Sequence, residues 1–179
     1  MSNPRHIQNL ALIGFMGTGK STIGRIVADD LRFDFLDTDA EIESRTGVSI
    51  ADIFAKQGEG AFRQLEQQIV IELAGRQRHV ISAGGGLVVN PANLASLKTH
   101  ALTVCLWASP ERIWERVRHQ SHRPLLQDAD PMARIRALLA VREPFYRQAD
   151  VLLNTELRSA REVANQVIHQ FRSAVAAWR

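Results

Sequence analysis

Residues 14–21 read GFMGTGKS and directly follow the apolar run LALI at residues 10–13. The octapeptide matches the phosphate-binding pattern G-x-x-x-x-G-K-[ST], in which a strand leads through a glycine-rich turn into a helix. Backbone N–H groups and the N-terminus of that helix then converge on one point, which favours a bound phosphate. A glycine-rich turn that merely joins strand to helix is the alternative, but the apolar run before the turn favours nucleotide binding.

The residue types of this loop suit a nucleotide. Its glycines at positions 14, 17 and 19 allow backbone conformations that other residues resist. Lys20 can reach the β- and γ-phosphate oxygens, and Ser21 supplies a hydroxyl for Mg²⁺. We expect the nucleotide to be bound by the loop and the first helical turn, namely by Gly17, Thr18, Gly19, Lys20, Ser21 and Thr22.

Length and composition indicate one soluble globular domain. The chain has 179 residues, of which 45% are hydrophobic and 23% charged. No apolar run approaches the roughly 20 residues that a membrane span requires. Residues 1–14 hold only a short apolar stretch without a small-residue cleavage site, so they do not read as a signal peptide. We therefore expect a single domain over residues 1–179, in the cytosol and not in a membrane.

The charged residues and the single cysteine narrow the partners. The net charge of +3 would allow a nucleic-acid partner, but the arginines are spread along the chain and form no basic block. We expect small anionic molecules instead. Cys105 lies in the apolar run at 104–107 and reads as a buried strand residue, so a disulfide and a thiolate metal cluster are both excluded. The histidines match no zinc-binding spacing.

Strand and helix patterns alternate along the chain. Apolar spacing predicts strands at 10–13, 33–36, 80–81, 103–106 and 151–153, and helices at 21–31, 39–45, 49–56, 60–75, from 110 onward, 131–147 and 160–178. This order predicts an α/β fold in which a parallel five-stranded sheet lies between two layers of helices. Ligands in such folds bind at the carboxyl ends of the strands.

Two carboxylates follow the second predicted strand. Asp37 and Asp39 stand two apart in a segment that we expect to be extended, so they would share a face near the phosphate loop. Either aspartate taken alone could simply cap the next helix. The two together beside a magnesium site favour metal or substrate binding.

With this pair in place, the chain closely resembles the shikimate kinases, small phosphate-loop enzymes that phosphorylate the 3-hydroxyl of shikimate in aromatic amino-acid biosynthesis. The resemblance covers almost the whole chain and rests on GFMGTGKSTIGR (14–25), FLDTDAEIE (35–43), GVSIADIF (47–54), FRQLE (62–66), GGG (84–86), RPLL (123–126) and REPFY (142–146). It implies a monomer with the three-layer P-loop NTPase fold, which resembles nucleoside-monophosphate kinases. A substrate-binding insert would span about 38–66, and a lid about 119–130.

The resemblance also implies the substrates ATP and shikimate, with Mg²⁺ as cofactor. Ser21 would ligate Mg²⁺, and Asp37 would hold the metal through its water shell. Asp39 would hydrogen-bond the shikimate hydroxyls, and in the family it is proposed as the catalytic base. Phosphoryl transfer has a loose transition state, and an aspartate with a pKa of about 4 is a weak base. We therefore expect Asp39 mainly to orient the attacking hydroxyl.

Shikimate carries a carboxylate, which arginine can bind with two planar donors. By resemblance, Arg63 and Arg142 bind this carboxylate, and Glu66, one helical turn after Arg63, fixes its guanidinium. An exposed helical ion pair is the alternative for Arg63 and Glu66. Phe54 and Phe62 would wall the pocket, although a plain core role suits either of them.

Three glycines follow the strand at 80–81. Around Gly84, Gly85 and Gly86 the backbone can approach a ligand closely, and we expect Gly85 to make the main substrate contact. A purely structural turn is the alternative. The strand also ends without the aspartate of the usual Walker B pattern, which leaves Asp37 as the carboxylate for the metal.

Three arginines complete the site by resemblance. Arg123 would reach the transferring phosphate from the lid, neutralise charge there and help to exclude water. Arg116 corresponds to an arginine that packs on adenine, and Arg158 to one at the nucleotide edge, aligned only with a one-residue shift. We therefore expect Lys20, Asp39 and Arg123 to be the catalytic residues.

Two other functions stay open at this point. A gluconate kinase would share the phosphate loop and lid, but it need not combine Asp39, Arg63, the three glycines and Arg142. A nucleotide sensor or nucleic-acid-binding protein would concentrate its basic charge on one face, and the sequence contains no such block.

Overall fold

Five short strands form a single parallel sheet in the order β2-β3-β1-β4-β5. The computed structural model describes residues 5–119 and 129–177. The strands are β1 (Asn9–Ile13), β2 (Asp34–Asp37), β3 (His79–Ser82), β4 (Ala101–Trp107) and β5 (Val151–Asn154). The helices are α1 (Lys20–Leu31), α2 (Thr38–Thr46), α3 (Ile50–Leu73), α4 (Pro91–His100), α5 (Pro110–Val117), α6 (Pro131–Tyr146) and α7 (Ala160–Ala177), with a 3-10 turn η1 (Leu87–Val89).

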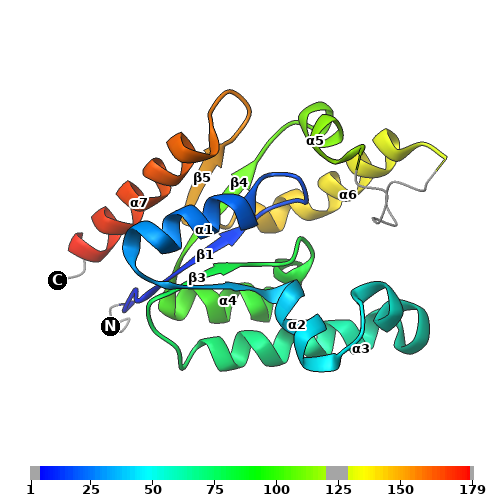
Figure 1. Cartoon of the computed structure of the whole chain (residues 1–179), viewed down its shortest axis with the longest axis horizontal. Helices are drawn as coiled ribbons and strands as arrows, with labels where there is room; N and C mark the ends of the chain where they lie inside the picture. The colour runs from blue at the N-terminus through cyan, green and yellow to red at the C-terminus, as the bar shows by residue number, and fades with distance from the viewer. Residues whose placement is uncertain (1–4, 120–128, 178–179) are drawn as a thin grey trace.

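Helices cover both faces of the sheet. Alternate residues of a strand point to opposite faces, and in β1 Leu10 and Leu12 pack with α1 and α7, whereas Ala11 and Ile13 pack with α3, α4 and α6. Figure 1 shows α1 and α7 together on one side of the sheet and α3 and α4 on the other. The predicted three-layer α/β fold is therefore confirmed. Within the described ranges, no helix is long and apolar enough to cross a bilayer.

The parallel order brings the segments of the site together at one edge of the sheet. The carboxyl ends of parallel strands meet at the same edge. There β1 continues into residues 14–19, β2 into α2, and β3 into residues 83–86. Ser82, the last residue of β3, pairs in register with Leu12 on one side and Asp37 on the other. Three loops from distant parts of the sequence therefore lie side by side.

Several helix boundaries follow from the capping residues that the sequence shows. Ser49 accepts a hydrogen bond from the backbone N–H of Asp52, and Ser109 accepts one from Arg112. Helix α3 contains a break at Gly58, where φ is 83° and ψ is 170°. This break separates the two helical segments predicted at 49–56 and 60–75.

Two predictions about local structure are wrong. Helix α4 was not predicted, although Asn90, which accepts from the N–H of Ala92, and Pro91 in the first turn are helix-start signals. Asp39 does not lie in an extended segment, because α2 begins at Thr38. The Asp37 carboxylate accepts from the N–H groups of Asp39 and Ala40, and this cap turns the chain into a helix.

Candidate active site

The phosphate loop has the backbone that its glycines predict. The φ angles of Gly14, Gly17 and Gly19 are 133°, 74° and 94°, which other residues rarely adopt. Lys20 folds back over the loop, and its Nζ donates to the carbonyls of Gly14 and Phe15 at 2.8 Å each. The Lys20 ammonium group is therefore fixed against the phosphate loop at the amino end of α1.

One hollow of about 350 Å³ joins this loop to the other strand ends. Its lining includes most of the predicted nucleotide residues, both predicted metal residues and, of the predicted acceptor residues, Asp39, Gly84 and Gly85. The full lining is Met16, Gly17, Gly19, Lys20, Ser21, Thr22, Asp37, Asp39, Ser82, Ala83, Gly84, Gly85 and Arg116. Thr18 is placed differently from its neighbours in the loop. Its side chain is buried, and its hydroxyl donates to the carbonyl of Phe15 at 2.8 Å, so only its backbone could serve a nucleotide.

The two residues expected at the metal are in direct contact. Ser21 Oγ donates to Asp37 Oδ2 at 2.7 Å, and the Ser82 hydroxyl lies 3.3 Å from Ser21 Oγ. Asp37 therefore caps α2 with one oxygen and faces the phosphate loop with the other. Asp37 can therefore cap α2 and also serve as the predicted metal residue, because the two roles use different oxygens of its carboxylate.

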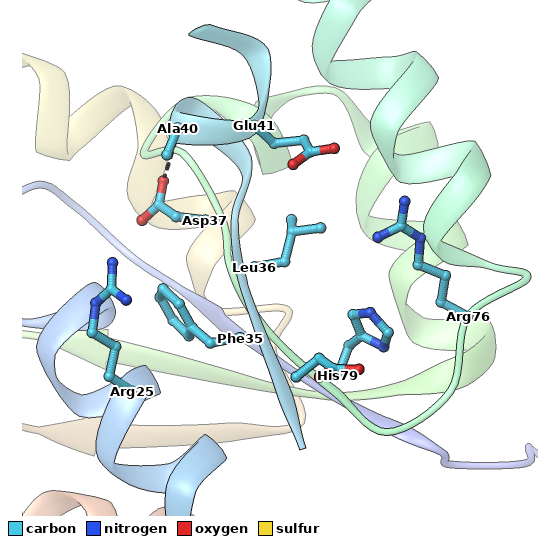
Figure 2. A pocket seen from close by; sticks show the side chains of 9 residues that line it. Arg25, Phe35, Leu36, Asp37, Ala40, Glu41, Arg76 and His79 are labelled. Carbon is cyan, nitrogen blue, oxygen red and sulfur yellow. Dashed lines mark hydrogen bonds between the residues drawn. The ribbon is translucent and has the colours of Figure 1, made fainter. Parts of the chain in front are cut away.

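Asp37 also borders a second hollow, of about 450 Å³, on its outer side (Figure 2). Figure 2 shows Arg25 beside Phe35, whose ring centroid lies 4.5 Å from the Arg25 guanidinium carbon, and Arg76 and His79 on the other side. Among residues 5–119 and 129–177, Asp37 alone lines both hollows. The phosphate loop and the second hollow are thus separated by the start of α2.

The acceptor side is built from α2, α3 and the glycines after β3. Thr38 accepts the N–H of Gly84 on its hydroxyl at 2.8 Å, which ties the start of α2 to the glycine segment. On α3, Arg63 donates to Glu66 Oε2 at 2.7 Å, and the Glu66 side chain is only 1% exposed. Burial raises the pKa of Glu66 above its usual range, although Arg63 opposes this shift. The contact is therefore not the exposed ion pair considered as an alternative.

Each of the three glycines faces a different charged side chain. A Cβ atom at residue 84 would lie 2.4 Å from Asp39 Oδ1, and one at residue 86 would lie 2.7 Å from an Arg63 nitrogen. At residue 85 it would lie 3.4 Å from an Arg142 nitrogen. The segment thus gathers Asp39, Arg63 and Arg142, which come from α2, α3 and α6.

The aromatic residues differ in exposure. Phe54 and Phe62 contact each other with ring centroids 4.9 Å apart, but Phe62 is buried and Phe54 is 39% exposed. Phe62 also lies below the Arg63 guanidinium, at 5.4 Å. Phe62 therefore has a core position that touches the site, whereas Phe54 stands at its outer side.

Arg116 and Arg158, both predicted to contact the nucleotide, lie at different distances from the phosphate loop. Arg116 donates to the carbonyl of Gly17 at 3.2 Å and to the hydroxyl and carbonyl of Thr155 at 2.9 and 2.6 Å, so it connects the phosphate loop with the loop after β5. The structure does not bring Arg158 into the phosphate-loop hollow. Its guanidinium donates to the Asn154 carbonyl and borders a separate hollow beside α7. Arg123 lies outside the described residues, and its role stays a prediction.

Sequence reasoning missed three residues of this site. Thr38 and Ser82 flank the predicted carboxylates in space, but a lone hydroxyl residue carries no motif of its own. Tyr146 was quoted only as part of a family motif, and its hydroxyl donates to the Gly85 carbonyl. The pairing of β2 with β3, which places Ser82 opposite Asp37, is the information that would have found Ser82.

Comparison with known proteins agrees with this geometry. A family model described as shikimate kinase matches residues 16–172. The chain belongs to the shikimate kinase family. Members of this family are kinases that use ATP as co-substrate.

Similar proteins support this membership. A shikimate kinase from Caldanaerobacter subterraneus subsp. tengcongensis is 45% identical over 165 residues, which cover 92% of this chain and 96% of that protein. The structure of a shikimate kinase from Acinetobacter baumannii in complex with shikimate is 37% identical, with a TM-score of 0.88 over 94% of this chain and 95% of that one. A gluconokinase from Sinorhizobium meliloti is only 17% identical, with a TM-score of 0.64 over 97% of both chains, and shares the fold alone.

Proposed function

We propose that this enzyme transfers the γ-phosphate of ATP to the 3-hydroxyl of shikimate, giving shikimate 3-phosphate and ADP on the route to chorismate and the aromatic amino acids. The observation that carries the proposal is the single hollow lined by Lys20 and Ser21 on one side and by Asp39 and Gly85 on the other. A donor and an acceptor bound there would meet without any other segment between them.

The donor half binds phosphate. The backbone N–H groups of the glycine loop and the amino end of α1 would bind the β- and γ-phosphates. Lys20 would exchange its bonds to the carbonyls of Gly14 and Phe15 for phosphate oxygens. Arg116 donates to the Gly17 carbonyl from outside the loop, and this contact supports the proposal that Arg116 packs on the adenine.

The contact between Ser21 and Asp37 fits Mg²⁺. This ion keeps several waters and uses one or two protein oxygens together with substrate phosphates, so it needs no cage of acidic residues. In the described part of the chain, no group of three or more His, Cys, Asp or Glu residues could hold a metal, and the 2.7 Å contact supplies one hydroxyl and one carboxylate. Bound there, Mg²⁺ would neutralise phosphate charge.

The acceptor half positions a hydroxylated acid. Arg63 faces Gly86 and Arg142 faces the neighbouring Gly85, so the two arginines would bind the shikimate carboxylate together, and buried Glu66 holds Arg63 in place. Asp39 would accept a hydrogen bond from the attacking hydroxyl. That oxygen forms the new bond to the γ-phosphorus while the bond to the ADP oxygen breaks, and Asp39 can take the released proton.

All residues named for this site come from one chain, so we propose the monomer as the working unit. We place the enzyme in the cytosol, where ATP is available. The gluconate kinase alternative is disfavoured because the gluconokinase is only 17% identical to this chain, whereas the shikimate kinase from Caldanaerobacter is 45% identical over nearly its whole length.

An assay of ADP release tests the proposal. Purified protein with ATP and Mg²⁺ should release ADP with shikimate and far less with gluconate or without an acceptor. Equal rates without shikimate would refute the proposed reaction.

The variant Asp39→Asn tests the role of the carboxylate. We expect it to abolish transfer and to leave ADP binding, measured by calorimetry, nearly intact, because Asp39 faces the acceptor. A large loss of ADP affinity would contradict this placement.

A further inference from the structure

The Tyr146 hydroxyl connects two of the residues proposed to bind the acceptor. Tyr146 is the last residue of α6 and is 6% exposed. Its hydroxyl donates to the backbone carbonyl of Gly85 at 2.5 Å. Arg142 lies one turn earlier on the same helix, with a nitrogen 3.4 Å from the position of a Cβ at residue 85. Two side chains of one helix thus reach the same glycine.

Arg142 also lies near the Tyr146 hydroxyl. Its guanidinium carbon lies 5.5 Å from the centroid of the Phe15 ring, and its charge is close enough to Tyr146 to act on the pKa of the tyrosine. Burial raises the pKa of Tyr146 to about 12, although Arg142 opposes this shift. The hydroxyl therefore keeps its proton at neutral pH. It donates to the Gly85 carbonyl, and its oxygen keeps lone pairs that can accept from a guanidinium.

We propose that Tyr146 is a positioning residue for the acceptor carboxylate, because its hydroxyl fixes the Arg142 guanidinium and the Gly85 backbone at one spacing. The inference rests on the proposed function, in which Arg142 and Gly85 bind shikimate. Arginine has a long side chain with several rotatable bonds, so a hydroxyl between it and the Gly85 backbone would restrict its position. A phenylalanine would fill the same space without holding either partner.

The variant Tyr146→Phe tests the proposal. We expect KM for shikimate to rise about tenfold, the effect of losing a hydrogen bond to a charged group. We expect kcat to change by no more than about twofold, because the carboxylate is bound alike in the ground state and the transition state.

A second substrate separates positioning from simple destabilisation. Shikimate methyl ester lacks the carboxylate charge, so the ratio of kcat/KM for shikimate to that for the ester should fall about tenfold in Tyr146→Phe. An unchanged ratio would overturn the proposal. If the wild-type protein fails to phosphorylate shikimate at all, the proposed function is wrong instead, so the two failures are distinguishable.

Thr103→Val provides a matched control. Thr103 is a buried residue of β4 whose hydroxyl donates to Asp150 Oδ2 at 2.7 Å, away from the acceptor half of the site. The same hydroxyl accepts from the N–H of Asp150 at 3.1 Å, so valine removes two hydrogen bonds of a hydroxyl far from the acceptor half. We expect this variant to lower the melting temperature and to leave the substrate ratio within about twofold of wild type. A fall in the ratio as large as that in Tyr146→Phe would show that the effect reports stability, and it would overturn the proposal.

The wild-type protein offers a test that does not depend on a variant. Tyr146 is the single tyrosine of the chain, so tyrosine labelled with ¹³C at Cζ gives one NMR signal from this site. Saturating shikimate should shift this signal, and saturating methyl ester should shift it less. A signal that shikimate leaves unmoved would overturn the proposal even if Tyr146→Phe does not fold.

Discussion

At the scale of single residues, the glycines after β3 are needed for space and not for backbone conformation. None of Gly84, Gly85 and Gly86 has a φ angle in the left-handed region. A Cβ at residue 84 would nevertheless lie 2.4 Å from an Asp39 oxygen and 3.3 Å from Glu66 Oε1. Gly84 therefore leaves the space that the Asp39 carboxylate occupies, and any side chain at residue 84 would displace it.

Gly84→Ala should lower kcat about a hundredfold, because a displacement of about 1 Å at a reacting group can cost that much. Nucleotide affinity should change little, because the phosphate loop is not involved. The measurements are steady-state kinetics and ADP binding by calorimetry.

Gly75→Ala is the matched control for Gly84→Ala. A Cβ at residue 75 would meet only the Glu72 carbonyl, at an ordinary 3.6 Å. This variant should retain wild-type kcat, and full activity in Gly84→Ala would contradict the argument.

The sequence predicts single residues well where a motif carries them. Lys20, Ser21 and Asp37 stand in order along a phosphate loop and a strand end, and the structure brings all three into one hollow. The hydroxyls of Thr38 and Tyr146 instead form hydrogen bonds to the backbone of Gly84 and Gly85, which are distant from them in sequence. No spacing rule reveals such a contact, because it depends on which loops the sheet places together.

At the scale of elements, the break in α3 determines how the segment with Phe54 meets the rest of the helix. Gly58 has a φ of 83° and a ψ of 170°, a conformation that is almost confined to glycine. The aromatic contact between Phe54 and Phe62 spans this break. The helix axis therefore changes direction at Gly58, while Phe54 before the break stays packed on Phe62 after it.

Gly58→Ala should destabilise the protein by about 1–3 kcal/mol, the cost of forcing a side chain into this conformation. The free energy of unfolding in urea measures the effect.

Gly60→Ala, two residues further on, is the control for Gly58→Ala. Residue 60 is helical, has no φ in the left-handed region, and a Cβ there would meet nothing within 4 Å. Alanine should stabilise this position by about 0.5–1 kcal/mol. Equal effects of the two substitutions would show that the break is not strained.

Sequence patterns locate elements more reliably than they locate turns between them. The five strands lie where apolar runs predicted them, because a buried parallel strand is apolar on both faces. Helix α4 was missed although its start signals were present, because Leu94 and Leu97 are its only large apolar residues on the buried face. The helix predicted at 39–45 begins one residue earlier, at Thr38, because Asp37 caps it, so Asp37 and Asp39 do not share the extended segment that was predicted for them.

At the scale of the whole molecule, a cluster around Asp150 ties together the amino ends of β4 and β5 and residues before β1. Both Asp150 oxygens accept from Arg5 at 2.7 Å, and Oδ2 also accepts from the N–H and hydroxyl of Thr103. Burial alone would raise the pKa of Asp150, but these donors hold it well below its usual range. The folded state therefore binds this proton less readily than the unfolded state does.

Asp150→Asn should lower the free energy of unfolding at pH 7 by about 2–3 kcal/mol. A depressed folded-state pKa gives stability that is fully present above the unfolded pKa of about 4 and is lost as the pH falls below it. The difference between wild type and variant in urea unfolding should therefore narrow from pH 7 to pH 3. kcat at neutral pH should stay unchanged, because the cluster lies at the edge of the sheet opposite the site.

Asp30→Asn is the control for an ordinary surface pair. Asp30 contacts Arg161 at 2.9 Å with both side chains partly exposed, so its loss should cost less than about 1 kcal/mol. A similar cost for both variants, or a difference that does not depend on pH, would argue against the special role of Asp150.

The junction at Thr38 has a consequence for exchanging parts between kinases of this fold. Asp37 contacts Ser21 of the phosphate loop, Asp39 lies beside Gly84, and the Thr38 hydroxyl between them accepts from the Gly84 N–H. One inserted residue would rotate the Asp39 side chain by about 100° around α2 and carry it away from Gly84. A segment transplanted from another kinase therefore has to begin after residue 38 and to keep the chain length before it, because Thr38 fixes the position of Asp39 relative to the phosphate loop.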